Sequence, residues 1–256
     1  MVRVESLAFS YGTHPLLHDL SFSVAERSSY AILGTTGCGK STLLHLLAGL
    51  HRPDHGSITI AGEECRTIRD QTALILQDGG LMPWKTIAEN VSLGLEVRGI
   101  ARSEARARAR TTLETLGIDH RARAYPSGVS GGERQRAALA RALVLEPDLL
   151  LLDEASAALD AITRERIQDL LLAIFRERHL TMVLVTHSIE EAVALGERIA
   201  VLCDGRIASE QENTAFSPHP DRFSAQFAER CRLVRNALVA GATTDADARD
   251  ERGNAP

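Results

Sequence analysis

Lysine is nearly absent from this chain of 256 residues. Of its 29 basic residues only Lys40 and Lys85 are lysines, and the others are arginines. We interpret this bias as compositional, although a lysine that survives it merits attention. Acidic residues outnumber basic ones, for a formal net charge of -5. This balance argues against a surface built mainly to hold nucleic acid, whose phosphates favour a strongly basic face.

Cysteine is also scarce, and long apolar runs are missing. The four cysteines, at positions 38, 65, 203 and 231, show no C-x-x-C spacing. The sequence therefore predicts neither a zinc knuckle nor a disulfide framework, and a reducing cytosol fits best. The N-terminus alternates and carries charge at once, unlike a secretory signal. No apolar run approaches the roughly 20 residues that span a bilayer. If the protein acts at a membrane, it is therefore expected to do so from outside the lipid.

Short apolar strands alternate with helical patterns along the chain. An antiparallel strand pair is expected near the N-terminus, over residues 2–9 and 16–24. Further strands are expected at 30–33, 57–60, 72–76, 148–152, 181–185 and 198–202, and helices at 40–50, 87–97, 103–116, 131–146, 162–178 and 189–195. Strands separated by helices imply an α/β fold with a mostly parallel sheet covered on both faces.

Two stretches differ from this alternation. The block from about Gly79 to Arg123 is helical without a strand signal, which predicts an all-helical insertion. Its arginines are typical of a solvated helix face, and they are Arg102, Arg106, Arg108, Arg110, Arg121 and Arg123. From Ala237 to Pro256 the residues are small, polar and charged, so this tail is expected to be disordered.

The strongest motif lies between the strand at 30–33 and the helix after it. It matches the phosphate-loop pattern G-x-x-x-x-G-K-S and consists of Gly34, Thr35, Thr36, Gly37, Cys38, Gly39, Lys40 and Ser41. In such a loop backbone N–H groups turn toward phosphate, and the helix N-terminus adds about half a positive charge. Lys40 then reaches the β- and γ-phosphate oxygens, and Ser41 ligates magnesium. The ordinary alternative is a glycine-rich strand-to-helix turn.

Two adjacent carboxylates follow a strand of four leucines. Asp153 and Glu154 stand at its carboxyl edge, where open α/β sheets bind ligands. Because neighbouring side chains of a strand point to opposite faces, the two acids are expected to have different tasks. Asp153 suits a magnesium shell, and Glu154 suits polarising a water against the γ-phosphate. Without the phosphate loop, two such acids would more often form a helix cap or a turn.

Ser130 opens a further motif before an apolar helical run. With Glu133 it fits S-x-x-E, which alone is a capping box that starts a helix. Combined with the phosphate loop and the acidic pair, the motif makes the chain resemble the nucleotide-binding subunit of an ATP-binding cassette (ABC) transporter over about residues 2–230. The other positions that carry the resemblance, in matching order, are Tyr11, Gln77, Ala158-Leu159-Asp160 and His187.

The resemblance implies a P-loop NTPase fold of ABC type. A single ABC ATPase domain is expected over residues 1–236, followed by the tail at 237–256. Its mostly parallel, RecA-like core carries an antiparallel β subdomain, and an α-helical subdomain is inserted at about 79–130.

The resemblance also implies a role for each motif residue. ATP and Mg²⁺ are the expected cofactors. Tyr11 would stack on adenine, with an ordinary packing role at the strand end as the alternative. The loop from Gly34 to Thr42 would hold the phosphates. The expected catalytic set is Glu154, His187, Gln77 and Lys40, and the expected magnesium ligands are Ser41, Gln77 and Asp153. His187 would contact the γ-phosphate, and the nearby Ser188 and Glu191 fit a capping box.

In this family two subunits pack head to tail as a homodimer. Ser130, Gly131 and Gly132 of one subunit then face the γ-phosphate held by the other, and Asp160 crosses the same interface. ATP binding closes the dimer and hydrolysis reopens it. Three departures from the family pattern stand at Val129, Ala155 and Ala157, and the stretch 62–77 is shorter than usual.

Residues 77–86 and 89–95 resemble the importer branch that handles nitrate, sulfonates, taurine and similar small solutes. Residues 81–84 suggest the groove that receives a permease's coupling helix, with packing under a loop as the alternative. The implied partners are transmembrane permease subunits and a periplasmic or extracellular solute-binding protein, with no nucleic acid. The implied location is peripheral, on the cytoplasmic face of the inner membrane.

Other functions are open to the same motifs. An ABC exporter or lipoprotein-release ATPase is the nearest, and only the sequence after Gln77 argues against it. A cassette ATPase acting on DNA or ribosomes would carry a long coiled-coil insertion or a second cassette. A non-catalytic nucleotide sensor would lack Glu154 or His187, and both are present.

Overall fold

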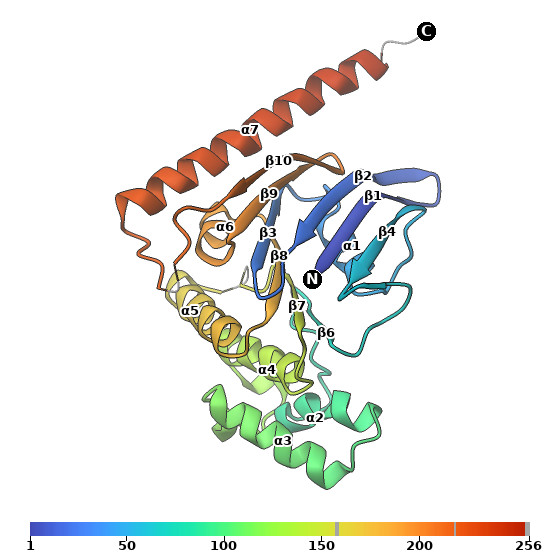
Figure 1. The fold of residues 1–256 in the computed structure, drawn as a ribbon. Coiled ribbons are helices and arrows are strands. Elements are labelled where there is room, and N and C mark those ends of the chain that lie inside the picture. The colour runs from blue at the N-terminus through green and yellow to red at the C-terminus, as the bar shows by residue number, and fades with distance from the viewer. Residues whose placement is uncertain (157–158, 218, 254–256) are drawn as a thin grey trace. The chain divides into compact units, whose positions relative to one another are not determined.

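The computed structural model describes residues 1–156, 159–217 and 219–253, which fall into two units. Unit 1 holds Met1–Arg69 and the chain from Leu172 onward, and unit 2 holds Asp70–Leu171. Figure 1 draws the elements of both. The positions Ala157 and Ala158, which belong to one of the motifs above, lie outside the described residues.

Unit 1 contains a four-stranded antiparallel sheet in the order β2-β1-β4-β5. Its strands are β1 (Val2–Tyr11), β2 (His14–Val24), β4 (His55–Ile60) and β5 (Glu63–Glu64). A bulge at Ser6, whose φ is +45°, shifts the register so that both Val4 and Leu7 are buried. The predicted N-terminal strand pair is confirmed.

The second sheet of unit 1 carries the phosphate loop. Its order is β10-β9-β3-β8, where β3 (Ser29–Gly34), β8 (Thr181–Thr186) and β9 (Arg198–Cys203) are parallel and β10 (Arg206–Glu212) is antiparallel to β9. All six residues of β3 are buried, as expected of a strand covered on both faces. Helix α1 (Lys40–Leu47) follows β3, and helix α6 (Ile189–Leu195) packs on β3. Helix α1 is shorter than predicted because Gly49 turns the chain at a φ of +72°.

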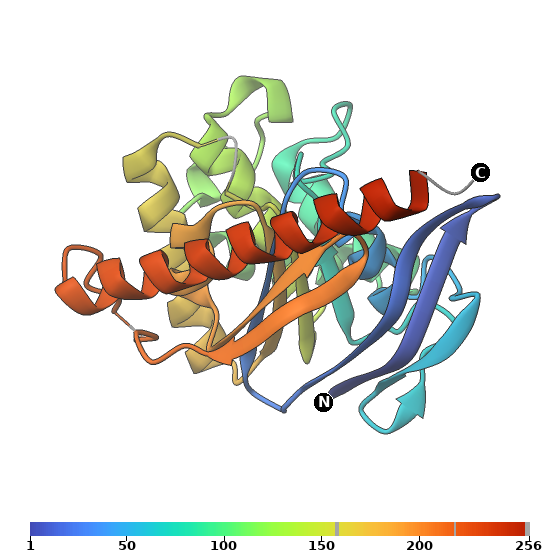
Figure 2. The same cartoon turned by 90° about the horizontal axis from the view of Figure 1, so that it is seen from above.

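Helix α7 (Ala225–Gly253) closes the chain of unit 1. It lies along β9 and β10 in Figures 1 and 2 and also packs on α6. Phe227 and Val234 of this helix are buried. The sequence predicts disorder from Ala237, whereas the helix continues to Gly253, since alanine and arginine favour helix.

Unit 2 combines a parallel strand pair with helices. Strands β6 (Thr72–Ile75) and β7 (Leu149–Asp153) pair in register from Thr72 with Leu149 to Ile75 with Leu152. The helical elements are α2 (Ile87–Val97), α3 (Arg102–Thr115), the 3-10 turns η1 (Asp119–Arg121) and η2 (Pro126–Gly128), and α4 (Gly131–Leu143). Helix α5 (Ala161–Glu177) begins in unit 2 and ends in unit 1. Residues 79–130, all of them described, hold no strand, as the sequence predicts.

The arginines of α3 form the solvated face that the sequence predicts. Arg102, Arg106, Arg108 and Arg110 are all exposed, and the last two pair with Glu104 and Glu114 one turn away. Within the described ranges, none of the helices is both long enough and apolar enough to cross a membrane.

Candidate functional site

In unit 1 the phosphate loop is built by backbone conformation. Strand β3 ends at Gly34, and Gly37 and Gly39 take φ values of +85° and +102° before α1 begins. A Cβ on Gly39 would also lie 2.6 Å from Leu17 Cδ2, so only glycine suits this position. Gly39 is the N-cap of α1 and gives it no side-chain cap. The first N–H groups of α1 thus have no capping side chain and suit an anion.

Lys40 lies folded over this loop. It is 5% exposed, and its Nζ donates to the carbonyl oxygens of Gly34 at 3.0 Å and Thr35 at 2.9 Å. These bonds hold a positive charge against the concave side of the loop, while Thr35 and Thr36 remain exposed. Ser41, at the first turn of α1, is exposed as well. The arrangement fits a phosphate chain that approaches from solvent.

Tyr11, the candidate for adenine stacking, stands at the end of β1. Its hydroxyl oxygen lies 3.5 Å from Thr42 Oγ1 on α1. Phe9 and His51 meet its ring edge to face, with centroids 5.0 and 6.0 Å away. The ring is nevertheless 48% exposed. It therefore has both a fixed position beside the loop helix and surface left for a flat ligand.

His187 follows β8 at the edge where the phosphate loop begins. Because β3 and β8 are parallel, with Leu33 opposite Thr186, Gly34 and His187 leave the sheet at the same end. His187 is exposed. The predicted capping box after it forms only in part. Ser188 Oγ accepts from the Glu191 N–H, as in a capping box. The Ser188 N–H, however, donates to Thr186 Oγ1, and the Glu191 carboxylate accepts from the Thr186 hydroxyl.

In unit 2 the carboxyl ends of β6 and β7 bring three predicted residues to one edge. Gln77 and Glu154 each lie two residues beyond the last register pair, Ile75 with Leu152, and Asp153 is the last residue of β7. Asp153 is only 6% exposed, whereas Glu154 is half-buried and has a φ of +47°. A left-handed conformation costs free energy in a residue other than glycine, and such residues gather at functional sites.

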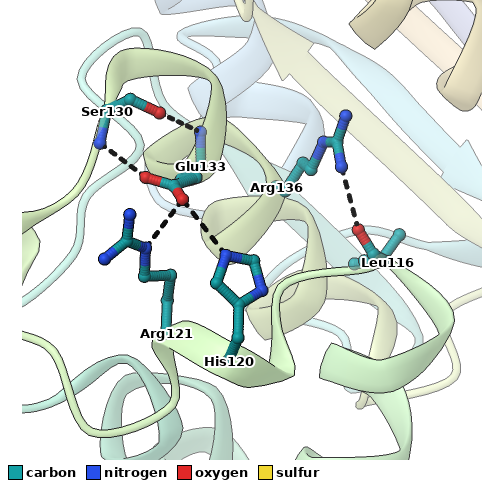
Figure 3. A network of polar contacts seen from close by, with 6 residues as sticks. All are labelled: Leu116, His120, Arg121, Ser130, Glu133 and Arg136. Carbon is teal, nitrogen blue, oxygen red and sulfur yellow. Dashed lines mark hydrogen bonds and ion pairs between the residues drawn. The ribbon is translucent and has the colours of Figure 1, made fainter.

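The Ser130 end of α4 is held by side chains, as Figure 3 shows. Ser130 Oγ accepts from the Glu133 N–H at 3.3 Å, and Glu133 Oε2 accepts from the Ser130 N–H at 2.8 Å, so the predicted capping box is confirmed. Glu133 Oε1 also accepts from Arg121 Nε at 2.8 Å and lies 3.4 Å from His120 Nε2. The hydrogen bond from Arg121, followed by that from the Ser130 N–H, lowers the pKa of Glu133 to about 2.

Asp160 serves its own unit as a helix cap. Its Oδ1 accepts from the Thr163 N–H at 3.0 Å, one turn into α5. Hydrogen bonds from Thr163 lower the pKa of this carboxyl. Asp160 is exposed, so the cap leaves its outer side open to solvent.

Two side chains without a predicted role, Arg141 and Asn90, shape the segment after Gln77. Arg141 on α4 donates to the carbonyl oxygens of Gly79 and Gly80, and burial lowers its pKa. Asn90 is fully buried; its amide nitrogen donates to the carbonyls of Met82, Lys85 and Thr86, and its oxygen accepts from the Met82 N–H. No motif points to Arg141, because it acts on backbone carbonyls of another segment. Asn90 lies in the stretch 89–95 that carries the importer resemblance, but its local sequence does not predict these contacts.

Trp84 is presented to solvent by this segment. It is 71% exposed, although tryptophan is usually well covered. The alternative that residues 81–84 are ordinary packing under a loop therefore does not describe this side chain. An exposed tryptophan on a pinned loop is typical of a contact surface.

The candidate magnesium ligands are oxygen donors. Ser41, an exposed residue of unit 1, has a hydroxyl oxygen, and Asp153 and Gln77 of unit 2 have a carboxylate and an amide oxygen. Hard oxygen ligands of this kind suit Mg²⁺. Among the described residues, no group of three or more His, Cys, Asp or Glu side chains is placed to hold a metal ion.

Comparison with known proteins adds to this geometry. Residues 17–157 match the family described as ABC transporter. The chain is 44% identical to the aliphatic sulfonates import ATP-binding protein SsuB of Burkholderia ambifaria, over 96% of this chain and 74% of that protein. It is also 44% identical to SsuB 2 of Pseudomonas aeruginosa, over 80% of this chain and 73% of that protein.

Solved structures with the same fold are ATP-binding cassettes. A dimeric, post-hydrolysis structure of the cassette MJ0796 bound to ADP and Pi covers 84% of this chain and 100% of that chain, with 31% identity and a TM-score of 0.75. A second dimeric structure of this bacterial ABC transporter cassette, with 30% identity, has a TM-score of 0.76 over the same shares. The predicted fold class is confirmed.

Proposed function

Because the chain belongs to the ABC transporter family and accordingly binds and hydrolyses ATP, we propose that it is the ATPase subunit of an importer for small sulfonate-type solutes. Similarity to sulfonate import ATP-binding proteins over nearly the whole chain carries this proposal. The relatives compared above are import proteins, so they do not favour the exporter or lipoprotein-release alternative.

The proposed nucleotide site assigns the phosphates to unit 1. Residues 34–42 bind the phosphate chain through backbone N–H groups, and Lys40 neutralises the β- and γ-phosphate oxygens. Tyr11 stacks on adenine through its exposed ring. His187, at the same sheet edge, contacts the γ-phosphate. The inward-held Nζ of Lys40 and the uncapped start of α1 support these roles.

Hydrolysis depends on the acids and amide of unit 2. Glu154 orients and polarises the attacking water, Gln77 contacts that water, and Asp153 holds magnesium together with Ser41 and Gln77. Bound magnesium would neutralise part of the phosphate charge. The half-buried position of Glu154 directly after β7, at the carboxyl edge of the strand, supports its role.

The subunit acts as a head-to-tail homodimer in this proposal. The start of α4 and the residues Ser130, Gly131 and Gly132 stabilise the γ-phosphate bound by the partner's loop, and Asp160 lies at the same interface. The exposure of Ser130 and of Asp160 supports this arrangement. ATP binding closes the dimer, and hydrolysis opens it again.

The dimer works on membrane-spanning partners. Permease subunits dock at the segment that presents Trp84, and a periplasmic or extracellular solute-binding protein delivers the solute. The ATPase is thus peripheral, on the cytoplasmic face of the inner membrane. The exposed Trp84 on a segment pinned by Asn90 supports the docking role.

The ATPase assignment is tested by Glu154→Gln. We expect a loss of steady-state turnover of at least about 100-fold, because the water loses its polarising carboxylate, with an ATP dissociation constant close to wild type. The variant should also accumulate as an ATP-bound dimer in sedimentation velocity. Turnover within a few-fold of wild type would remove Glu154 from its proposed role.

The solute class needs a separate experiment. In the source organism, deletion of this coding sequence should abolish growth with an alkanesulfonate as the sole sulfur source and leave growth on sulfate unchanged. A plasmid copy should restore growth, and a Lys40→Ala copy should not. Normal growth of the deletion strain on alkanesulfonates would overturn the solute class while leaving the ATPase assignment in place.

A further inference from the structure

Glu133 is held from two sides at the start of α4. Its Oε2 accepts from the Ser130 N–H, while its Oε1 accepts from Arg121 and lies beside His120 (Figure 3). The Glu133 side chain is 20% exposed, and that of Arg121 is 45% exposed. One oxygen thus serves the helix cap and the other serves a cation. Arg121 is the one arginine of the predicted solvated set whose guanidinium bonds to this capping box.

The segment that carries Arg121 is tied to α4 at a second point. One turn beyond Glu133, Arg136 Nη1 donates to the Leu116 carbonyl at 3.4 Å. Residues 133 and 136 lie on the same face of the helix. Glu133 therefore bonds to Arg121 within η1, and Arg136 bonds to Leu116 before it. Arg121 therefore has a fixed place relative to Ser130, unlike the arginines on α3.

The second capping box of unit 2 shows what is particular here. In α2, Glu89 Oε2 accepts from both the N–H and the hydroxyl of Thr86, so the box closes on itself. In α4, Glu133 Oε1 is instead engaged by Arg121. A cavity of about 240 Å³ opens beside the α4 box, lined by Ser130, Gly132, Glu133 and Arg166 among others. The α4 box is thus accessible, and its carboxylate accepts a hydrogen bond from a guanidinium of another segment, whereas Glu89 has only the charges of Lys85 and Arg106 acting on it.

This difference matters because the two helix ends have different tasks. A carboxylate in the first turn stabilises a helix, but it also repels an anion that approaches the same N-terminus. At α2 no phosphate is expected. At α4 the proposed function brings a γ-phosphate to Ser130, and an unneutralised Glu133 would oppose it.

We propose that Arg121, with His120 beside it, is a positioning residue that neutralises Glu133 and fixes the Ser130 box, so that α4 receives the partner subunit's γ-phosphate without repulsion from its own cap. Arg121 itself does not touch ATP. The inference rests on the proposed head-to-tail site and adds a charge requirement to it.

The test compares Arg121→Gln, Glu133→Gln and the double variant in the full-length chain. With AMP-PNP and Mg²⁺, Arg121→Gln should weaken nucleotide-dependent dimerisation about tenfold, since a charge-assisted contact is lost and an anionic neighbour is left behind. Nucleotide affinity of the monomer should not change. Glu133→Gln retains an acceptor for the Ser130 N–H without the charge, so the double variant should dimerise within about twofold of Glu133→Gln alone.

A matched control and two further readouts separate this role from a structural one. Arg110→Gln removes an ion pair of 2.9 Å on exposed α3 and should change nothing. Raising the ionic strength from 0.02 to 0.3 M should shrink the Arg121→Gln defect, because salt screens the repulsion. Arg121→Lys keeps the charge and should recover most of the dimerisation.

Two outcomes would overturn the inference. The first is that Arg121→Gln dimerises as well as Arg110→Gln. The second is that the loss of dimerisation in the double variant equals the sum of the losses in the two single variants and is the same at both ionic strengths. Ser130→Ala distinguishes these failures from failure of the proposed function. If Ser130→Ala impairs dimerisation and Arg121→Gln does not, only the inference fails, whereas a silent Ser130→Ala would remove the composite site itself.

Discussion

The phosphate loop of unit 1 and the Ser130 end of α4 in unit 2 are both helix N-termini suited to an anion, but they are built differently. The loop depends on backbone conformation: glycines at positive φ, an uncapped helix and a lysine bonded to local carbonyls. The α4 end depends on side chains, with a capping box held by Arg121 from a separate segment. Local sequence fixes the first kind of site, whereas the second needs tertiary contacts.

Lys40→Ala should have the largest effect, a loss of ATP binding by the phosphate loop. Removing its ammonium takes away a charge held 3.0 Å from the Gly34 carbonyl, at the place where phosphate charge collects. We expect ATP affinity to fall by at least about 100-fold, because several charge-assisted hydrogen bonds are lost together. Titration with a fluorescent ATP analogue measures it, and an unchanged dissociation constant would contradict a phosphate-binding loop.

Ser130→Ala and Thr86→Ala sharpen the comparison at the other helix ends. Both substitutions remove the N-cap of a capping box, so each should cost about 1 kcal/mol of stability. Only Ser130→Ala should also reduce ATP turnover, by about 10²- to 10³-fold, since it removes a donor to developing charge. Thermal melts and steady-state hydrolysis of the isolated chain measure the two effects. Equal turnover in both variants would reduce Ser130 to a structural cap.

The smallest expected effect concerns acid pH. The pKa of Glu133 is lowered to about 2, so the stability from its contacts is complete above pH 4.5 and is lost as the pH falls from there toward 2. Arg121→Gln raises this pKa back toward its ordinary value. The difference in unfolding free energy between wild type and variant should therefore shrink between pH 5 and pH 3 in urea titrations. A difference that stays constant over this range would show that Arg121 acts without Glu133.

The parts of the site that depend on backbone conformation could be predicted from the sequence. The phosphate loop, the β7 acids and both flanking strands follow from local patterns, and each lies at the predicted strand end. The sequence predicts Arg121 to be solvated like the α3 arginines, because nothing in its local sequence distinguishes a solvated guanidinium from one that bonds to Glu133. Strand β10 and the whole of α7 are absent from the predicted elements, since their polar and small residues give little hydrophobic periodicity.

The most direct test of the account mixes two inactive subunits. Lys40→Ala lacks a working loop, and Ser130→Ala lacks a working α4 end, so a mixed dimer holds one site in which both parts are intact. With equal amounts and random pairing, half of the dimers are mixed and half of their sites are intact, which predicts about a quarter of the wild-type number of sites. ATP hydrolysis should then rise well above that of either variant alone. A mixture no more active than its components would contradict a site shared between two copies of this chain.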